Sequence, residues 1–120
     1  AEFAYHLSDS KTWNSSVKLS QLIIDKIHKN LNVPIQQTHG SSSKKVAPGV
    51  FSRNLFLNRS LYGVPFSYIE CLYYNHPKEF EMLSQKDYSI EIDGETHYYS
   101  QRLLDLAQSI KQAVVEYFTH

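Results

Sequence analysis

The chain has 120 residues, a length typical of one domain, so we expect residues 1–120 to form a single domain. Lys and Arg together number 12, as do Asp and Glu, and this neutral balance argues against nucleic acid as the main partner, which usually requires a basic face. No apolar run has the length of a membrane span, and the single cysteine, Cys71, excludes a disulfide within the chain.

The first half of the sequence predicts a strand, a long helix and a polar loop. Residues 3–7 are typical of a short strand. A helix is then expected to begin at Ser15 or Ser16 and to end near residues 30–32, before a proline. Residues 38–45 are predicted to form a polar loop that carries a solvated Lys-Lys pair. The apolar stripe of the helix consists of Val17, Leu19, Leu22, Ile23, Ile27 and Leu31.

Two further strands are expected in the middle of the chain. Pro48-Gly49 leads into a strand at residues 54–57, and a third strand is predicted over residues 65–72. The apolar density of this third strand, with proline only at its first position, is typical of a strand covered on both faces.

The last part of the sequence predicts a short helix, a hairpin and a long helix. Asn75 or His76 is expected to cap the short helix, with Pro77 in its first turn. Residues 88–99 predict a β-hairpin that turns at Asp93-Gly94. Ser100 is expected to cap a final helix that ends at Phe118, with an apolar stripe formed by Leu103, Leu106, Ala107, Ile110, Val114 and Tyr117. The alternation predicts an α/β fold: a mostly parallel sheet flanked by helices, with an inserted β-hairpin before the C-terminal helix.

Glu70 is the candidate catalytic residue. It lies near the carboxyl end of the strand predicted over residues 65–72, and ligands of open α/β sheets bind at that edge. A carboxylate that has lost hydration there has a raised pKa, which suits a general base. The alternative is an ordinary ion pair between Glu70 and a nearby Lys or Arg.

Cys71 and the tyrosines offer two other kinds of chemistry. A nucleophilic Cys71 would need a base and an orienting group, and a small buried apolar residue is the simpler interpretation. The chain has nine tyrosines, most of which we expect at the edge of the core. In a carbohydrate-binding module, four of them would stack on sugar rings: Tyr62, Tyr68, Tyr73 and Tyr74.

Several segments, in order, resemble the carboxyl-terminal half of a zinc-dependent N-acetylmuramoyl-L-alanine amidase of type 3. Residues 3–7 and 15–20 resemble the strand and the helix start of the family, and residues 49–57 resemble its Gly-Val loop and the strand that follows. Residues 64–70 resemble the strand that ends in the catalytic Glu. After it come the family's spaced Asn, Glu and Leu, as Asn75, Glu79 and Leu83, and the match runs through residues 84–88 and the last helix.

Two departures from the family pattern concern the stretch after Glu70 and the hairpin. The family has Glu-x-Gly-Phe-x-Ser-Asn, whereas this chain has Glu70-Cys71-Leu72-Tyr73-Tyr74-Asn75, one residue shorter and without the Gly. We therefore expect a backbone less free to curl around substrate. The hairpin at residues 88–99 resembles an insertion.

The resemblance implies a hydrolase that cuts the amide between N-acetylmuramic acid and L-alanine in bacterial peptidoglycan, during wall turnover, division or lysis. The implied cofactor is zinc, which the family holds with two His and one Glu and which activates the attacking water. The resemblance gives Glu70 the role of general base and acid on that water. It also implies a periplasmic or extracellular location, although the first residues of the chain show no signal peptide.

The family's zinc ligands have no counterparts in this sequence, and no His has a matching context: His6, His28, His39, His76, His97 or His120. The leading hypothesis is therefore the rear half of an amidase domain, whose zinc-bearing N-terminal segment lies outside the chain. The alternative is a non-catalytic peptidoglycan-binding or interaction module with a degenerate amidase fold.

Overall fold

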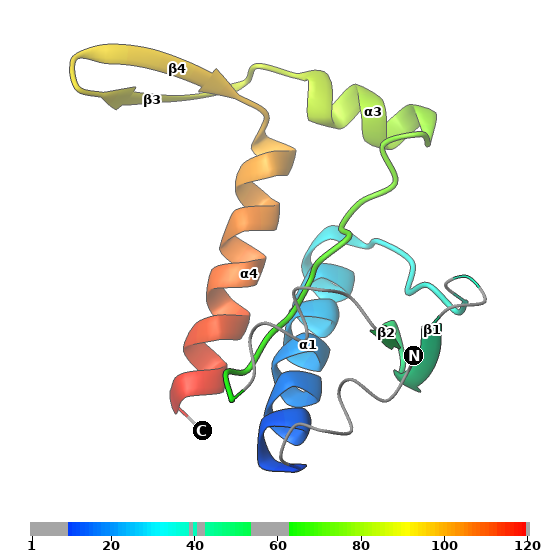
Figure 1. Ribbon diagram of the computed structural model, residues 1–120. Coiled ribbons are helices and arrows are strands. Elements are labelled where there is room, and N and C mark those ends of the chain that lie inside the picture. The colour runs from blue at the N-terminus through cyan, green and yellow to red at the C-terminus, as the bar shows by residue number, and fades with distance from the viewer. Residues whose placement is uncertain (1–9, 39, 41–42, 54–62, 120) are drawn as a thin grey trace.

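The computed structural model describes residues 10–38, 40, 43–53 and 63–119. Its elements are α1 (Ser10–Leu31), β1 (Ser43–Ala47), β2 (Val50–Arg53), α3 (Pro77–Ser84), β3 (Tyr88–Ile92), β4 (Glu95–Tyr99) and α4 (Gln101–Thr119). The long helices α1 and α4 lie side by side and run in opposite directions, β1 and β2 lie beside α1, and α3 and the β3–β4 hairpin lie at the N-terminal end of α4 (Figure 1).

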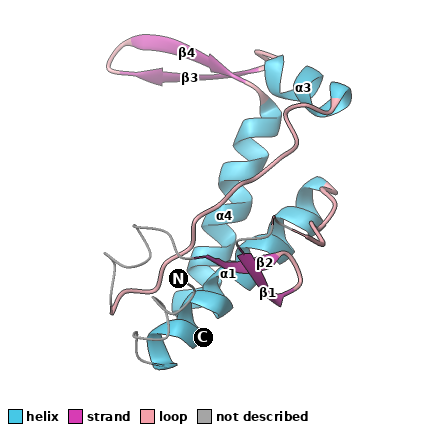
Figure 2. Cartoon of the chain, turned by 45° about the vertical axis from the view of Figure 1, so that its right-hand side comes forward, coloured by secondary structure: helices cyan, strands magenta, loops and turns pink. Residues whose placement is uncertain are grey.

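The expected fold class, a mostly parallel sheet flanked by helices, is wrong. The part of the chain that the structure describes contains two separate two-stranded antiparallel sheets, β1–β2 and β3–β4 (Figure 2). Each pair is joined by a two-residue turn, at Pro48-Gly49 and at Asp93-Gly94. Such turns pair neighbouring strands directly, whereas a parallel pair requires a long crossover connection. The polar loop expected at residues 38–45 is also wrong in part, since β1 includes Lys44 and Lys45.

Helix α1 has the predicted stripe and end but begins earlier than expected, at Ser10. Ser16 lies inside the helix, and its Oγ accepts the backbone N–H of Phe66 at 2.9 Å instead of capping the first turn. Asn32 follows the helix in the left-handed conformation, with φ 56°. Its N–H donates to the carbonyl of His28 at 3.0 Å, which satisfies an end carbonyl of the helix.

The core lies mainly between α1 and α4. Its buried apolar residues are Ile23, Ile27, Leu31, Val33, Leu106 and Ala113. Ser109 is fully buried on the same face of α4, where its Oγ donates to the carbonyl of Asp105 at 2.8 Å and accepts from Asn30 at 3.1 Å. The stripe predicted for α4 is therefore partly wrong. Leu103, Ala107 and Val114 are exposed, because the buried stripe of α4 runs through Leu106, Ser109 and Ala113 instead.

The third predicted strand, residues 65–72, is also wrong: this segment runs along α1 without joining a sheet of the described residues (Figures 1 and 2). Its side chains alternate, so that Ile69 and Cys71 pack against the helical core while Tyr68 and Glu70 are exposed. Only one face of the segment is buried, and it packs against helices and not against a sheet. The strands predicted at residues 3–7 and 54–57 lie outside the described residues.

The C-terminal elements confirm the local sequence signals. Helix α3 begins at Pro77 after His76, whose side chain makes no cap bond. Strands β3 and β4 form the predicted hairpin, and Ser100 Oγ accepts the N–H of Leu103 at 3.1 Å as an N-cap. A second acceptor, the carboxylate of Asp87, receives the N–H of Gln101 at 2.8 Å. No helix in the described ranges is both long and apolar enough to cross a membrane.

Candidate functional site

A pocket of about 570 Å³ lies beside the C-terminal half of α1. This volume is within the range of small-molecule sites, roughly 300–1,000 Å³. Its walls come from four parts of the chain: α1, the loop that follows it, the β1–β2 turn and the segment from 69 to 75. The lining residues are Ile24, Ile27, His28, Val33, Pro34, Ile35, Gln36, Gly49, Ile69, Glu70, Cys71, Leu72, Tyr73, Tyr74 and Asn75.

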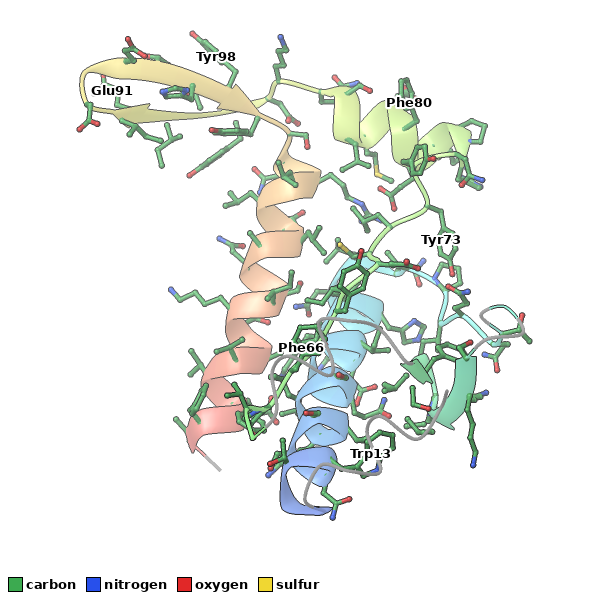
Figure 3. All side chains as sticks on the ribbon, in the orientation of Figure 1. Trp13, Phe66, Tyr73, Phe80, Glu91 and Tyr98 are labelled. Carbon is green, nitrogen blue, oxygen red and sulfur yellow. The ribbon has the colours of Figure 1, made fainter. Side chains whose placement is uncertain are left out.

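Three contacts hold these walls together. His28 Nδ1 lies 2.8 Å from the carbonyl oxygen of Val33. Since a carbonyl only accepts, Nδ1 is the donor, which leaves Nε2 as an acceptor in the neutral ring. Across the pocket, the hydroxyl of Tyr73 donates to the carbonyl of Pro34 at 3.4 Å (Figure 3 shows Tyr73 beside this loop). Gly49 has φ 73°, and an added Cβ would lie 3.0 Å from Ile24, so the turn needs glycine at this wall.

Glu70 lines the pocket, which agrees with its predicted place in a cleft. Its environment differs from the expected one, because it lies on an extended segment outside any described strand and its side chain is exposed. Water therefore reaches the carboxylate. The argument from lost hydration at the end of a buried strand does not apply to it.

The backbone curls next to Glu70 despite the missing glycine. Counted from Glu70, Leu72 stands where the amidase family has Gly, and Leu72 has φ 73°. A left-handed conformation costs a residue with a Cβ about 1 kcal/mol or more, and glycine avoids this cost. Packing of the Leu72 side chain against the core holds this strained conformation. A backbone less free to curl around substrate stays a prediction.

The thiol of Cys71 does not fit the role of a nucleophile. Cys71 is half-buried and packs against the core, and burial raises the pKa of its thiol. A raised pKa lowers the fraction of thiolate, which is the reactive form. The simpler interpretation, a small apolar core residue, fits this position.

The described residues do not offer a zinc site. Nowhere in these ranges do three or more His, Cys, Asp or Glu side chains gather so that they could hold a metal ion. His28 is in the pocket wall, His76 precedes α3, and His97 lies on β4 with its Nε2 4.0 Å from Glu95. The other three histidines, His6, His39 and His120, lie outside the described residues.

Two of the four predicted stacking tyrosines, Tyr73 and Tyr74, line the pocket, and Tyr74 is 75% exposed. Tyr68 is exposed but is not a lining residue, and Tyr62 lies outside the described residues. Sequence reasoning missed His28 and Gly49 as wall residues. The available signals were the predicted end of α1 before Pro34 and the Pro48-Gly49 turn, although neither signal says that the two loops meet.

Comparisons of the chain with protein-family models, with curated proteins and with solved structures find no match. The resemblance to an amidase therefore depends on the sequence segments quoted above.

Proposed function

We propose that this chain binds peptidoglycan through the pocket beside α1, as a wall-binding module. The observation that carries the proposal is the composition of the pocket wall. Among the lining residues that the structure describes, most are apolar, two are exposed tyrosines, and Glu70 is the only Lys, Arg, Asp or Glu. Tyrosine rings stack on sugars and on apolar peptide groups while their hydroxyls stay hydrated.

The charge of the wall indicates which part of the polymer would enter. A single carboxylate beside aromatic rings favours an amine-bearing group, through an ion pair and through cation–π contact. Stem peptides that carry a free amine on a diamino acid offer such a group next to a sugar. The sequence resemblance to an enzyme of the same polymer supports peptidoglycan as the ligand and a periplasmic or extracellular location.

A titration with soluble disaccharide-peptides from digested peptidoglycan tests this proposal. We expect saturable binding by calorimetry, and Tyr74→Ala should weaken binding by about two- to tenfold in Kd, since a stacking contact contributes roughly 0.5–1.5 kcal/mol. Tyr98→Ala on the hairpin is the matched control, because it removes another exposed ring away from the pocket. Glu70→Gln should weaken binding of ligands with a free amine but not of their N-acetylated forms. Absence of saturable binding, or equal loss in Tyr98→Ala, would contradict the proposal.

A second candidate is the amidase reaction, with Glu70 as general base and acid. Two observations favour it: Glu70 lines the pocket, and the backbone at Leu72 adopts the conformation that suits the family's glycine. The described residues do not fit zinc, so any zinc would need ligands from outside them. Incubation with cell-wall sacculi and zinc separates the two functions. Release of stem peptides that is lost in Glu70→Gln supports catalysis, while binding without release supports the module.

A further inference from the structure

The β3–β4 hairpin projects from the N-terminal end of α4 with no other element of the described residues beside it (Figures 1 and 2). Within those residues β3 and β4 pair only with each other. An isolated two-stranded hairpin is marginally stable in water, and a third strand or a packed face is usually needed. The hairpin is therefore a structure that lacks a packing partner in this part of the chain.

One face of the hairpin is apolar and exposed. The register places Tyr88 opposite Tyr99 and Ile90 opposite His97, and Ile92 next along the same face is opposite Glu95 at its end. Ile90 is 41% exposed and Ile92 is 46% exposed. The other face includes Tyr98, which points away from α4 (Figure 3).

The outer edges of the hairpin carry backbone groups that suit an added strand. With a two-residue turn, the pairs Ile92–Glu95 and Ile90–His97 exchange backbone hydrogen bonds. The residues between these pairs, Glu91 on β3 and Thr96 on β4, point their N–H and C=O outwards. A partner strand could extend the ladder at either edge.

Charge decides the chemistry of the partner. The hairpin carries Glu91, Asp93 and Glu95, and residues 87–101 include no Lys or Arg. Anionic membranes and nucleic acids would be repelled by these carboxylates, and so would the hairpin of a second copy. The carboxylates of Glu91 and Glu95 lie on opposite faces of the hairpin, and Glu95 lies beside the apolar residues. An extended protein segment that carries Lys or Arg among apolar residues would match both the apolar face and these carboxylates.

We propose that the β3–β4 hairpin is a docking site for a basic, extended segment of a partner protein, which adds to the hairpin as a third strand. The site is separate from the pocket beside α1, because no hairpin residue lines that pocket.

A charge-swap experiment with synthetic peptides tests the docking site. The probes are a decapeptide that alternates lysine with valine, its glutamate–valine counterpart, and a lysine–valine peptide with a central proline. We expect the lysine–valine peptide to bind the intact chain and to shift the amide resonances of residues 88–99. The glutamate and proline peptides should bind at least about tenfold more weakly. The glutamate peptide is repelled by the carboxylates of the hairpin, and the proline peptide lacks a backbone N–H that the added strand needs for its ladder of hydrogen bonds.

The decisive variant is the double substitution Glu91→Lys and Glu95→Lys, which should reverse the preference towards the glutamate peptide. Glu81→Lys is the matched control, since it changes an exposed carboxylate on α3. Binding of no peptide, or binding that ignores the charge swap, would overturn the proposal. Sedimentation of the chain alone should give a monomer, and self-association that the hairpin substitutions abolish would instead assign this surface to a second copy.

Discussion

At the scale of single residues, Leu72 is the most unusual position in the pocket wall. Its φ of 73° lies in the region that glycine occupies without strain, yet its side chain also packs against the helical core. Replacing it therefore has two opposite effects. Loss of the side chain destabilises the fold, while removal of Cβ relieves the backbone.

Comparison of Leu72→Ala with Leu72→Gly separates these effects, because both variants lose the packed side chain. We expect Leu72→Gly to be the more stable of the two by about 1 kcal/mol, the reverse of the usual order, in which glycine is less favourable by roughly 0.5–1 kcal/mol. Urea unfolding of the two variants measures the difference. Ile69 is the control, since it lies on the same segment without a positive φ, and its alanine variant should be the more stable. The usual order at Leu72 would contradict a strained wall.

At the scale of elements, sequence predicted what is locally determined. The C-terminal end of α1, the start of α3 at Pro77, the Asp93-Gly94 hairpin and the Ser100 cap all depend on residues within a few positions, and all are confirmed. The prediction of a strand at residues 65–72 is wrong, because apolar density indicates that a segment is covered but not whether a sheet or a helix covers it. For the same reason the prediction that Glu70 ends a buried strand is wrong, although Glu70 lines the pocket.

A contact that no local pattern indicated joins α3, α4 and the end of α1. Arg102 makes two hydrogen bonds of 2.7 Å with the carboxylate of Glu79, and its Nη1 donates to the carbonyl of Leu31 at 2.9 Å. The two side chains are 14% and 8% exposed. The bonds to Glu79 raise the pKa of Arg102, so the guanidinium stays charged. The sequence indicated Glu79 only as the Glu of the family's spaced Asn, Glu and Leu. It did not indicate the ion pair, since Arg102 lies 23 residues away.

Removing one partner of this pair should be costly. We expect Arg102→Met to lower the free energy of unfolding by about 3 kcal/mol, because it leaves the carboxylate of Glu79 buried without its partner. Lys26→Met is the matched control. It breaks the ion pair between Lys26 and Glu116, whose side chains are 29% and 38% exposed, and should cost less than about 1 kcal/mol. The double variant Glu79→Leu, Arg102→Met should recover much of the loss. Equal effects of the two single variants would show that the Arg102 pair does not join the elements.

At the scale of the whole molecule, the chain is less compact than a typical domain of its length. Its radius of gyration is 16.4 Å, against about 14 Å expected for a compact domain of this length. The difference agrees with the projecting hairpin and with apolar side chains left outside the helical core, such as Phe118, which is 78% exposed. Composition and charge alone do not reveal this shape, because an exposed apolar face and a buried one have the same sequence pattern.

An open molecule of this kind should unfold in separate parts. Replacement of residues 88–99 by a short Gly-Ser linker keeps both caps of α4, Asp87 and Ser100. We expect the melting temperature of the helical core to change by less than about 4 °C, since the hairpin strands pair only with each other in the described residues. Pocket ligands should still bind, while the lysine–valine peptide should not.

Ala113→Leu is the contrasting variant, because overpacking the fully buried seam of α1 and α4 costs roughly 1–3 kcal/mol and should lower the melting temperature further. Two results would instead make the hairpin part of one cooperative unit. The amides of the hairpin would exchange with the same opening free energy as those of the helical core, and the helical core would unfold when the hairpin is replaced.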